Sequence, residues 1–248
     1  MFRFLFSIAD VMQNSLNVKA LIFDLDDTLY DCSGTLVLQG RKHAAKMIAR
    51  LIHCSEEEAY HLQMKMEEQY GTNANIYEKI VAMHYLPNAC VNALWEEFIH
   101  IDIVGIALFP GVIETLKQLK AQGYKLILVT SGEKKIQNKK IHALGLKHNY
   151  FDDIFIADRI NGQTKNANFK EIIQRYYLRP EEIVCIGDKI DDELTAGKSL
   201  GMITVMVEHG RHYRAYLKGQ DKYSKPDYSI KQIKDILGIT NAISLITR

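Results

Sequence analysis

Short apolar runs alternate with amphipathic stretches along most of the chain. Five runs have the length and the polar flanks of buried strands, at residues 20–23, 125–129, 154–157, 183–186 and 203–207. Stretches with helical spacing of apolar residues separate the last four runs. Strands that alternate with helices in this way indicate right-handed βαβ units. The predicted fold is therefore α/β, with a doubly wound, Rossmann-like parallel sheet as its core.

Residues 35–104 contain helical patterns and no persuasive strand. Apolar residues recur at helical spacing in about four blocks, and Ser55 with Glu58 forms a capping box before one of them. This segment is an insertion that begins and ends near the carboxyl end of the first strand. It is therefore placed to cover that end. We expect a helical cap domain at 35–104, inserted into a core formed by residues 18–34 and 105–240.

Weaker patterns give four further expectations. Residues 208–225 are polar and basic, which favours a surface loop, and residues 229–237 have the pattern of a last helix. Trp95 and Tyr70 fit the packed interior of the cap better than contacts to a substrate. These expectations depend on composition and spacing within one short stretch each.

The composition is ordinary for a globular protein. Of the 248 residues, 47% are hydrophobic and 25% are charged, and the formal net charge is +1. The basic residues are scattered, and Lys134, Lys135, Lys139 and Lys140 are typical of a solvated helix face. This balance gives no reason to expect a nucleic-acid partner.

The cysteines and the N-terminus indicate a compartment. Four cysteines occur without CxxC spacing or a histidine cluster, which is neither a zinc pattern nor a dense disulfide framework. The apolar residues 2–9 are too few to span a bilayer and lack the layout of a signal peptide. We expect a cytoplasmic protein without a membrane partner. Met12 offers an alternative start, so it stays open whether residues 1–11 belong to the native chain.

Polar residues follow four of the predicted strands, and these strand ends meet at one edge of a doubly wound sheet. They are Asp24 and Asp26, Thr130 and Ser131, Lys165 beyond a loop, and Asp188 with Asp191, Asp192 and Glu193. Carboxylates are the ligands that Mg²⁺ prefers, while a lysine and hydroxyls suit a phosphate group. Asp24 and Asp26 point to the same side of an extended backbone and need a cation or a proton to coexist. The pattern predicts a metal-assisted site for phosphoryl transfer.

These motifs, in this order, resemble the haloacid dehalogenase superfamily, in its phosphatase branch with a helical cap between the first two motifs. The segment from Asp24 to Leu29 matches DxDxT, and the segment from Gly187 to Asp192 matches GDxxxD. Thr130 and Lys165 stand where the second and third motifs fall. The resemblance covers about residues 18–237.

The resemblance implies a role for each acidic residue. Asp24 would attack phosphorus and form an aspartyl-phosphate, and Asp26 would act as the general acid and then as the base. Mg²⁺ would be held by the Asp24 carboxylate, the Asp26 backbone carbonyl and Asp188, with Asp192 close by. Within the family, an acid at the position of Asp26 favours phosphoryl transfer over dehalogenation.

The resemblance also implies the phosphate ligands, with some alternatives left open. Thr130, with Ser131 beside it, and Lys165 would bind the phosphoryl oxygens. Lys170 or Lys189 could take the place of Lys165, which lacks the proline that often follows the family's lysine.

Neighbouring acids compete for one role in the fourth motif. Asp191 and Glu193 are alternatives to Asp192 as its second acid. In the first motif, we expect Asp27 to be a bystander in the turn, and Thr28 to fix that turn through local hydrogen bonds.

The expected function is a Mg²⁺-dependent phosphatase that hydrolyses a small phosphorylated metabolite, as a monomer or a homodimer. A phosphomutase with the same motifs is the alternative enzyme. A binding protein that keeps the fold without its activity is the alternative outside enzymes.

Overall fold

A six-stranded parallel sheet forms the centre of the molecule. The computed structural model describes residues 17–146, 149–158 and 161–246. The strand order is β3-β2-β1-β4-β5-β6, and every neighbouring pair is parallel. The strands are β1 (Ala20–Phe23), β2 (Lys125–Ser131), β3 (Asp153–Ala157), β4 (Ile183–Gly187), β5 (Ile203–Val207) and β6 (Tyr228–Ile230). The predicted α/β class and the five predicted strands are confirmed, and β6 is an addition.

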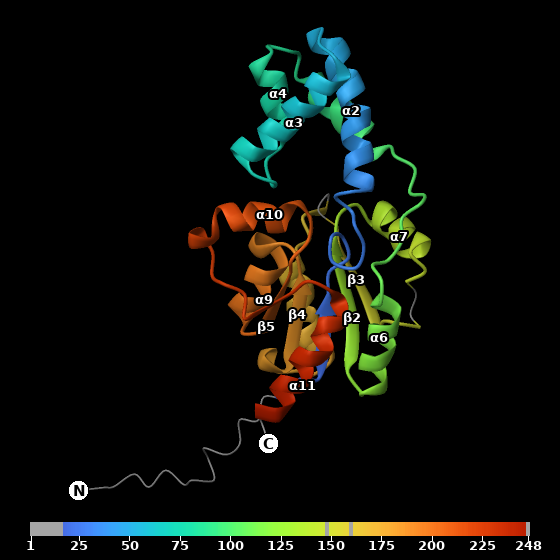
Figure 1. Ribbon diagram of the computed structural model, residues 1–248, viewed down its shortest axis with the longest axis vertical. Coiled ribbons are helices and arrows are strands. Elements are labelled where there is room, and N and C mark those ends of the chain that lie inside the picture. Colours follow the sequence, from blue (N-terminus) through green and yellow to red (C-terminus); the bar gives the residue numbers. More distant parts are fainter. Residues whose placement is uncertain (1–16, 147–148, 159–160, 247–248) are drawn as a thin grey trace, which may run out of the picture.

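Helices surround this sheet and also form a separate group above it (Figure 1). The separate group consists of α2 (Leu36–Ile52), α3 (Glu56–Tyr70), α4 (Ile76–Met83) and α5 (Ala89–Ile99). The others are α6 (Val112–Ala121), α7 (Lys134–Ala143), α8 (Lys165–Arg175), α9 (Thr195–Leu200), α10 (Gly210–Lys218) and α11 (Ile236–Ile246). One π-helical turn, Ile190–Leu194, precedes α9.

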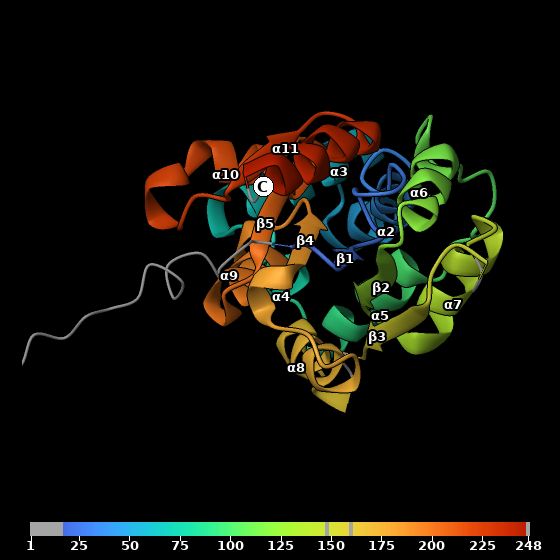
Figure 2. The ribbon, with the colours of Figure 1, turned by 90° about the horizontal axis from the view of Figure 1, so that it is seen from below.

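Both faces of the sheet are buried under helices, which explains the continuous apolar runs in the sequence. In β1, Leu21 and Phe23 belong to the core that α6 and α11 cover, and Ile22 belongs to the core that contains Phe169 of α8. Figure 2 shows α6 and α11 on one side of the sheet and α8 on the other. Because every strand is parallel, their carboxyl ends lie at the same edge, toward α2–α5.

The helices α2–α5 have a hydrophobic core of their own. Each contributes a fully buried side chain to it, namely Ile48, Met66, Ile80 and Leu94. The capping box predicted at Ser55 is present at the start of α3. These helices therefore pack mainly against one another, while Leu36 at the start of α2 belongs to the core of the sheet. They stand over the edge where the strands end.

The predictions for the C-terminal part were wrong in two places. Within residues 208–225, the structure has helix α10 instead of a loop, because Tyr213 and Tyr216, one turn apart, pack its basic sequence onto the sheet-side core. Residues 228–230 form β6, which pairs with β5, and the last helix starts only at Ile236. A strand of three residues is too short to show a period of its own.

Among the described residues, no helix is long and apolar enough to cross a membrane. The expectation for residues 1–11 lies outside the described part of the chain. The cysteines Cys32, Cys54, Cys90 and Cys185 are free thiols.

Candidate active site

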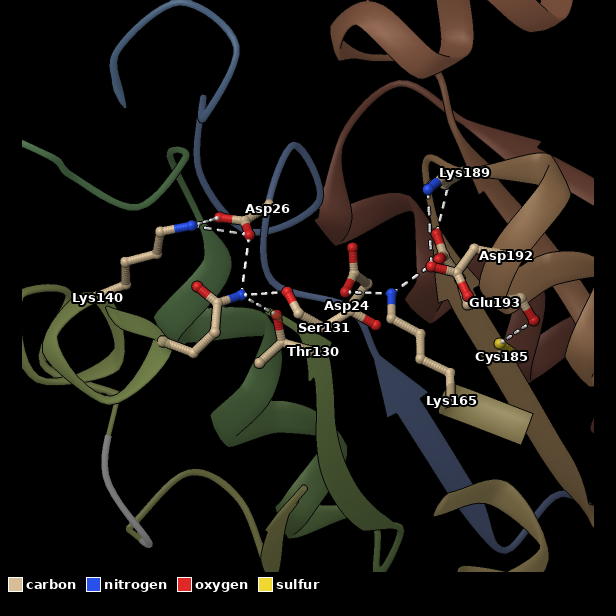
Figure 3. A network of polar contacts seen from close by, with 11 residues as sticks. Asp24, Asp26, Thr130, Ser131, Lys140, Lys165, Cys185, Lys189, Asp192 and Glu193 are labelled. Atoms are coloured by element: carbon tan, nitrogen blue, oxygen red, sulfur yellow. Dashed lines mark hydrogen bonds and ion pairs between the residues drawn. The ribbon is translucent and has the colours of Figure 1, made fainter. Parts of the chain in front are cut away.

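Asp24 lies directly after β1 and is paired with Lys165, the first residue of α8. Lys165 Nζ lies 2.6 Å from Asp24 Oδ1 and 2.8 Å from Glu193 Oε2 (Figure 3). Thr164 caps α8 by accepting a hydrogen bond from the Ala167 N–H, so the helix begins where Lys165 can reach the strand ends. Lys165 is only 3% exposed.

The alternatives to Lys165 lie elsewhere. Lys170 is exposed on the same helix. Lys189 is buried, and its Nζ lies 3.8 Å from Asp192 Oδ2. Of the three candidate lysines, Lys165 is therefore the one that forms an ion pair with Asp24 in the described structure.

In the fourth motif, the structure brings Glu193 toward Asp24 and Asp188. Oxygen atoms of these three carboxylates lie within 4.8 Å of one another. Asp192 is absent from this group, and Asp191 accepts a hydrogen bond of 2.6 Å from Asn73 of the helical group. The cause is the π-helical turn, whose wider repeat shifts the side chains relative to an α-helix. The open choice between Asp192 and Glu193 thus falls geometrically on Glu193.

Gly187 makes room for this arrangement. Glu193 folds back over the end of β4, and its Oε1 accepts a hydrogen bond of 2.8 Å from the Lys189 N–H. A β-carbon at position 187 would lie 2.2 Å from Glu193 Oε1. The glycine of the GD pair is therefore required by the side chain six residues later.

The carboxylate cluster is electrostatically unfavourable by itself. Burial, opposed by Lys165 and reinforced by Glu193, raises the pKa of Asp24 to about 7. Burial and the nearby Glu193 raise the pKa of Asp188 well above its usual range. Among the described residues, the buried Asp188 Oδ2 has no hydrogen-bond partner. An unpartnered carboxylate oxygen beside two further carboxylates is an environment that fits a cation with oxygen ligands.

Asp26 has a different set of partners from Asp24. Lys140 Nζ lies 2.9 and 3.0 Å from its two oxygens, Gln137 Nε2 donates to Oδ2 at 3.0 Å, and the Tyr30 hydroxyl donates to Oδ1 at 2.5 Å. Burial raises the pKa of Asp26, but Lys140 and these hydrogen bonds outweigh it and hold the pKa at about 2. Asp26 is therefore a carboxylate in the structure described here.

Lys140 and Gln137 were missed in the sequence. The Lys140 side chain is 12% exposed, so the prediction of a solvated face was wrong for this lysine. Gln137 is 1% exposed, and its Nε2 also donates to Thr130 Oγ1 at 2.6 Å and to the Ser131 carbonyl at 2.9 Å. The available signal was the Gln-x-x-Lys spacing, which places both side chains on one face of the helix after the second motif.

The turn after β1 differs in part from the prediction. Asp27 has a positive φ of 56°, and its carboxylate accepts hydrogen bonds from the backbone N–H and the hydroxyl of Ser33. It closes the turn. The buried Thr28 hydroxyl has no hydrogen-bond partner among the described residues, so its predicted bonding role was wrong.

A cavity of about 410 Å³ joins these groups to the helices above. Its floor consists of Asp24, Asp26, Thr130, Ser131, Lys140, Lys165, Asp188, Asp192 and Glu193. Its roof includes Arg41, Thr72, Asn73, Tyr77 and Trp95 from the helical group, with Arg211 and His212 from α10 at its side. All the site residues predicted from the sequence therefore line one cavity, although Asp192 is outside the carboxylate cluster.

Trp95 and Tyr70 are not interior residues of the helical group. Their exposed fractions are 37% and 44%. Trp95 lines the cavity while its ring contacts Tyr77 and Phe98 edge-on, and its Nε1 donates to Asn75 Oδ1 at 3.1 Å. The prediction of a packed interior was wrong for both residues.

Comparison with known proteins agrees with the fold and the motifs. The family model of haloacid dehalogenase-like hydrolases matches residues 18–201. A glyceraldehyde 3-phosphate phosphatase of Methanocaldococcus jannaschii is 30% identical, over 90% of this chain and 96% of its own. A pyrophosphatase PpaX of Bacillus mycoides is 30% identical, over 92% of this chain and 100% of its own. The crystal structure of a HAD phosphatase from Thermococcus onnurineus superposes with a TM-score of 0.60 at 26% identity, over 90% of this chain and 97% of that one.

The parallel sheet, the acids and Lys165 at its strand ends, and the family match together define a hydrolase with a Rossmann-like core. The chain belongs to the haloacid dehalogenase-like hydrolase family.

Proposed function

We propose that this protein is a Mg²⁺-dependent phosphatase that hydrolyses a small phosphorylated metabolite through an aspartyl-phosphate on Asp24. One observation carries the proposal. The Asp24 carboxylate lines a covered cavity, forms an ion pair with Lys165 and lies within 4.8 Å of carboxylate oxygens of Asp188 and Glu193. A carboxylate that has a lysine ammonium group and a cation-binding cluster beside it can receive a phosphate group, because both neighbours offset the negative charge of that group.

The first step transfers the phosphoryl group to the protein. An oxygen of Asp24 forms a bond to phosphorus while the bond from phosphorus to the leaving oxygen breaks. Asp26 gives a proton to the leaving oxygen. Asp26 is a carboxylate before the substrate binds, and the negative charge of the incoming phosphate raises its pKa. Asp26 therefore takes up a proton from solvent, or from the phosphate monoanion, before it acts as the acid.

The second step releases phosphate. Asp26, now a carboxylate again, accepts a proton from a water molecule as the water oxygen bonds to phosphorus and the bond to Asp24 breaks. Lys165 and the Thr130 and Ser131 hydroxyls are the groups available to stabilise the charge on the phosphoryl oxygens. Asp24 is then a free carboxylate again, and Asp26 returns to its starting state by releasing the proton it accepted from water to solvent or to the departing phosphate.

Asp24, Asp188 and Glu193, with the Asp26 backbone carbonyl, would hold Mg²⁺. When bound, Mg²⁺ would supply positive charge that reduces the repulsion between the phosphate and the Asp24 carboxylate. The unpartnered Asp188 Oδ2 and the raised pKa of Asp24 and Asp188 support this assignment, because each is relieved by a cation. Asp192 is the remaining candidate from the sequence, on the rim of the cluster.

Residues 35–104 would act as a cap domain on a core formed by 18–34 and 105–240. The cap carries its own hydrophobic core and forms the roof of the cavity. A roof excludes bulk water from the reacting groups and limits the substrate to a small molecule. The names of the relatives, which refer to glyceraldehyde 3-phosphate and pyrophosphate, make these two compounds the first candidates.

The proposal also includes the location and the oligomeric state of the enzyme. The free cysteines and the composition support a cytoplasmic location. A monomer and a homodimer both remain compatible with the proposal, because the site is built within one chain.

The experiment is a panel of phosphate compounds with phosphate release as the readout. It includes glyceraldehyde 3-phosphate, pyrophosphate, other small phosphorylated metabolites and p-nitrophenyl phosphate, each with Mg²⁺ and with a chelator. We expect Mg²⁺-dependent release of phosphate from at least one of these small compounds. Equal rates with chelator, or no phosphate release from any compound, would contradict the proposal. A phosphorylated isomer in place of free phosphate would point to a mutase.

A further inference from the structure

Helix α7 places two polar side chains against Asp26 from outside the four motifs. Gln137 and Lys140 are one helical turn apart, so they share a face. Their neighbours Lys134, Lys135 and Lys139 are exposed, whereas Gln137 is buried and Lys140 nearly so. The burial of these two alone indicates a role that the other lysines of the helix do not have.

Lys140 fixes the orientation of the Asp26 carboxyl group. Its Nζ lies at nearly equal distances, 2.9 and 3.0 Å, from the two carboxylate oxygens. The Tyr30 hydroxyl also donates a hydrogen bond to Oδ1. Figure 3 shows Lys140 against both oxygens of Asp26. A carboxyl group with a cation across both oxygens and a further donor to one of them has little freedom to rotate.

Gln137 connects the same carboxylate to the end of β2. Its single Nε2 atom lies within 3.0 Å of Asp26 Oδ2, the Thr130 hydroxyl and the Ser131 carbonyl. The position of Asp26 is thereby tied to the hydroxyl that faces the phosphate site. The Gln137 side chain, which belongs to neither motif, thus fixes Asp26 relative to the end of β2.

A packing role alone does not explain this arrangement. Removing an ammonium group from water has a large desolvation free energy, whereas an apolar side chain would fill the same space without it. Lys140 also lines the cavity together with Asp26, so it lies where the substrate would bind. The two carboxylates of the first motif thus have separate cations, Lys165 for Asp24 and Lys140 for Asp26.

We infer that Gln137 and Lys140 are positioning residues that aim the Asp26 carboxyl group at the leaving-group oxygen. The inference rests on the proposed function. Gln137 and Lys140 would act on the transfer of a proton to the leaving group. Other residues would bind the phosphoryl group. Loss of either side chain should therefore reduce kcat/KM most for substrates whose leaving group must be protonated.

The test compares two leaving groups in Lys140→Met and Gln137→Leu. An alkyl phosphate that the wild type hydrolyses needs protonation of its leaving oxygen, whereas p-nitrophenyl phosphate releases a stable anion. The readout is kcat/KM, because it reports the steps up to departure of the leaving group and excludes hydrolysis of the aspartyl-phosphate. Inhibition by inorganic phosphate is measured in parallel as a probe of phosphate binding.

We expect kcat/KM for the alkyl phosphate to fall by about 100-fold, the lower range of general acid catalysis. For p-nitrophenyl phosphate we expect a loss of less than about threefold, with inhibition by phosphate unchanged. Lys140→Arg, which keeps the charge, should recover most of the alkyl activity. Lys139→Met, an exposed change on the same helix, is the matched control and should behave as wild type.

Equal losses for both esters, or no loss for either, would overturn the inference. Weaker inhibition by phosphate with equal losses would also overturn it, since the residues would then bind phosphate. Should Lys140→Met fail to fold, Lys140→Gln, which keeps a polar side chain without the charge, and Gln137→Leu give the same comparison of leaving groups. A wild-type protein without hydrolysis refutes the proposed function and the inference together, whereas an active wild type with unchanged discrimination in the variants refutes the inference alone.

Discussion

Gly187 and Glu193 occupy one space at the end of β4: a β-carbon on the glycine would lie 2.2 Å from Glu193 Oε1 and 2.6 Å from its Cγ. Glu193 can reach Lys165 and the cluster with Asp24 and Asp188 only because position 187 has no side chain. The glycine of the fourth motif thus determines where the acid of the same motif lies.

Gly187→Ala should displace Glu193 from the cluster. We expect at least a tenfold loss of phosphatase activity and a higher Mg²⁺ concentration for half-maximal rate, because one of three carboxylates is removed. A Mg²⁺ titration of the rate measures both. Gly238→Ala is the control, since a β-carbon there meets nothing within 4 Å. A variant with the wild-type Mg²⁺ requirement would contradict this account of Glu193.

Lys165→Met should destabilise the fold in the absence of Mg²⁺. Lys165 is the cation between two buried carboxylates, and its removal leaves Asp24 and Glu193 facing each other. Removing one partner of a buried ion pair costs about 3–5 kcal/mol of unfolding free energy. Urea unfolding measures the loss.

Two further variants complete that experiment. Lys170→Met, exposed on the same helix, should change stability by less than about 0.5 kcal/mol. The double variant Lys165→Met with Asp24→Asn should recover part of the loss, because one of the two like charges is removed. If Lys165→Met is as stable as Lys170→Met, the ion pairs do not stabilise the native state.

Arg211→Met should weaken substrate binding with little effect on stability. Arg211 Nη1 lies 2.5 Å from Glu67 Oε2, which joins α10 to the helical group, and both side chains line the cavity. We expect KM to rise about threefold or more, because this ion pair helps to hold the roof over the site. Steady-state kinetics on the best substrate of the panel gives the value.

The control for Arg211 is the neighbouring contact between Lys218 and Glu68. Its side chains are 68% and 67% exposed, and exposed ion pairs contribute little. Lys218→Met should therefore leave KM unchanged. The same KM in both variants would mean that the Arg211–Glu67 contact has no part in covering the site.

Asp227 should give a pH-dependent contribution to stability. Its Oδ2 accepts hydrogen bonds of 2.8 and 2.7 Å from the backbone N–H and the hydroxyl of Thr204, and Lys198 Nζ lies 3.0 Å from its Oδ1. Partial burial raises the pKa of Asp227, but these donors outweigh it and lower the pKa below its ordinary value. A carboxylate whose pKa is lower in the folded state than in the unfolded state stabilises the protein fully at pH values above its unfolded-state pKa. This stabilisation is lost as the pH falls through the folded-state pKa.

Asp227→Asn should accordingly cost about 1 kcal/mol of unfolding free energy near neutral pH and less at about pH 3. Urea unfolding at the two pH values measures the difference. Asp221→Asn, an exposed change, should show no such dependence. A penalty for Asp227→Asn that stays constant or grows as the pH falls would show that the carboxylate charge is not the stabilising feature.

Much of the core could be predicted because parallel strands covered on both faces leave continuous apolar runs. The positions of Asp24, Asp26 and Asp188 could be predicted for the same reason, since Asp24 and Asp188 directly follow such runs and Asp26 lies two residues after Asp24. The short strand β6 left no period, and the basic sequence of α10 concealed the two tyrosines that dock it.

The finer parts of the site could not be predicted, because they depend on small shifts in three dimensions. A π-helical turn selects Glu193 over Asp192, and neighbouring acids give no sign of such a turn in the sequence. The Gln-x-x-Lys spacing separates Lys140 from Lys139, but only the packing of α7 shows that this face of the helix meets Asp26.

The central claim is that Asp24 carries the phosphoryl group. The direct measurement is rapid acid quenching of the enzyme during turnover with Mg²⁺ and its best substrate, followed by mass spectrometry of the peptide that contains Asp24. We expect the mass of one phosphoryl group on Asp24, removed by hydroxylamine as an acyl phosphate is, and no such adduct in Asp24→Asn. Turnover by an Asp24→Asn variant at the wild-type rate, or a phosphoryl group on a different residue, would contradict the account.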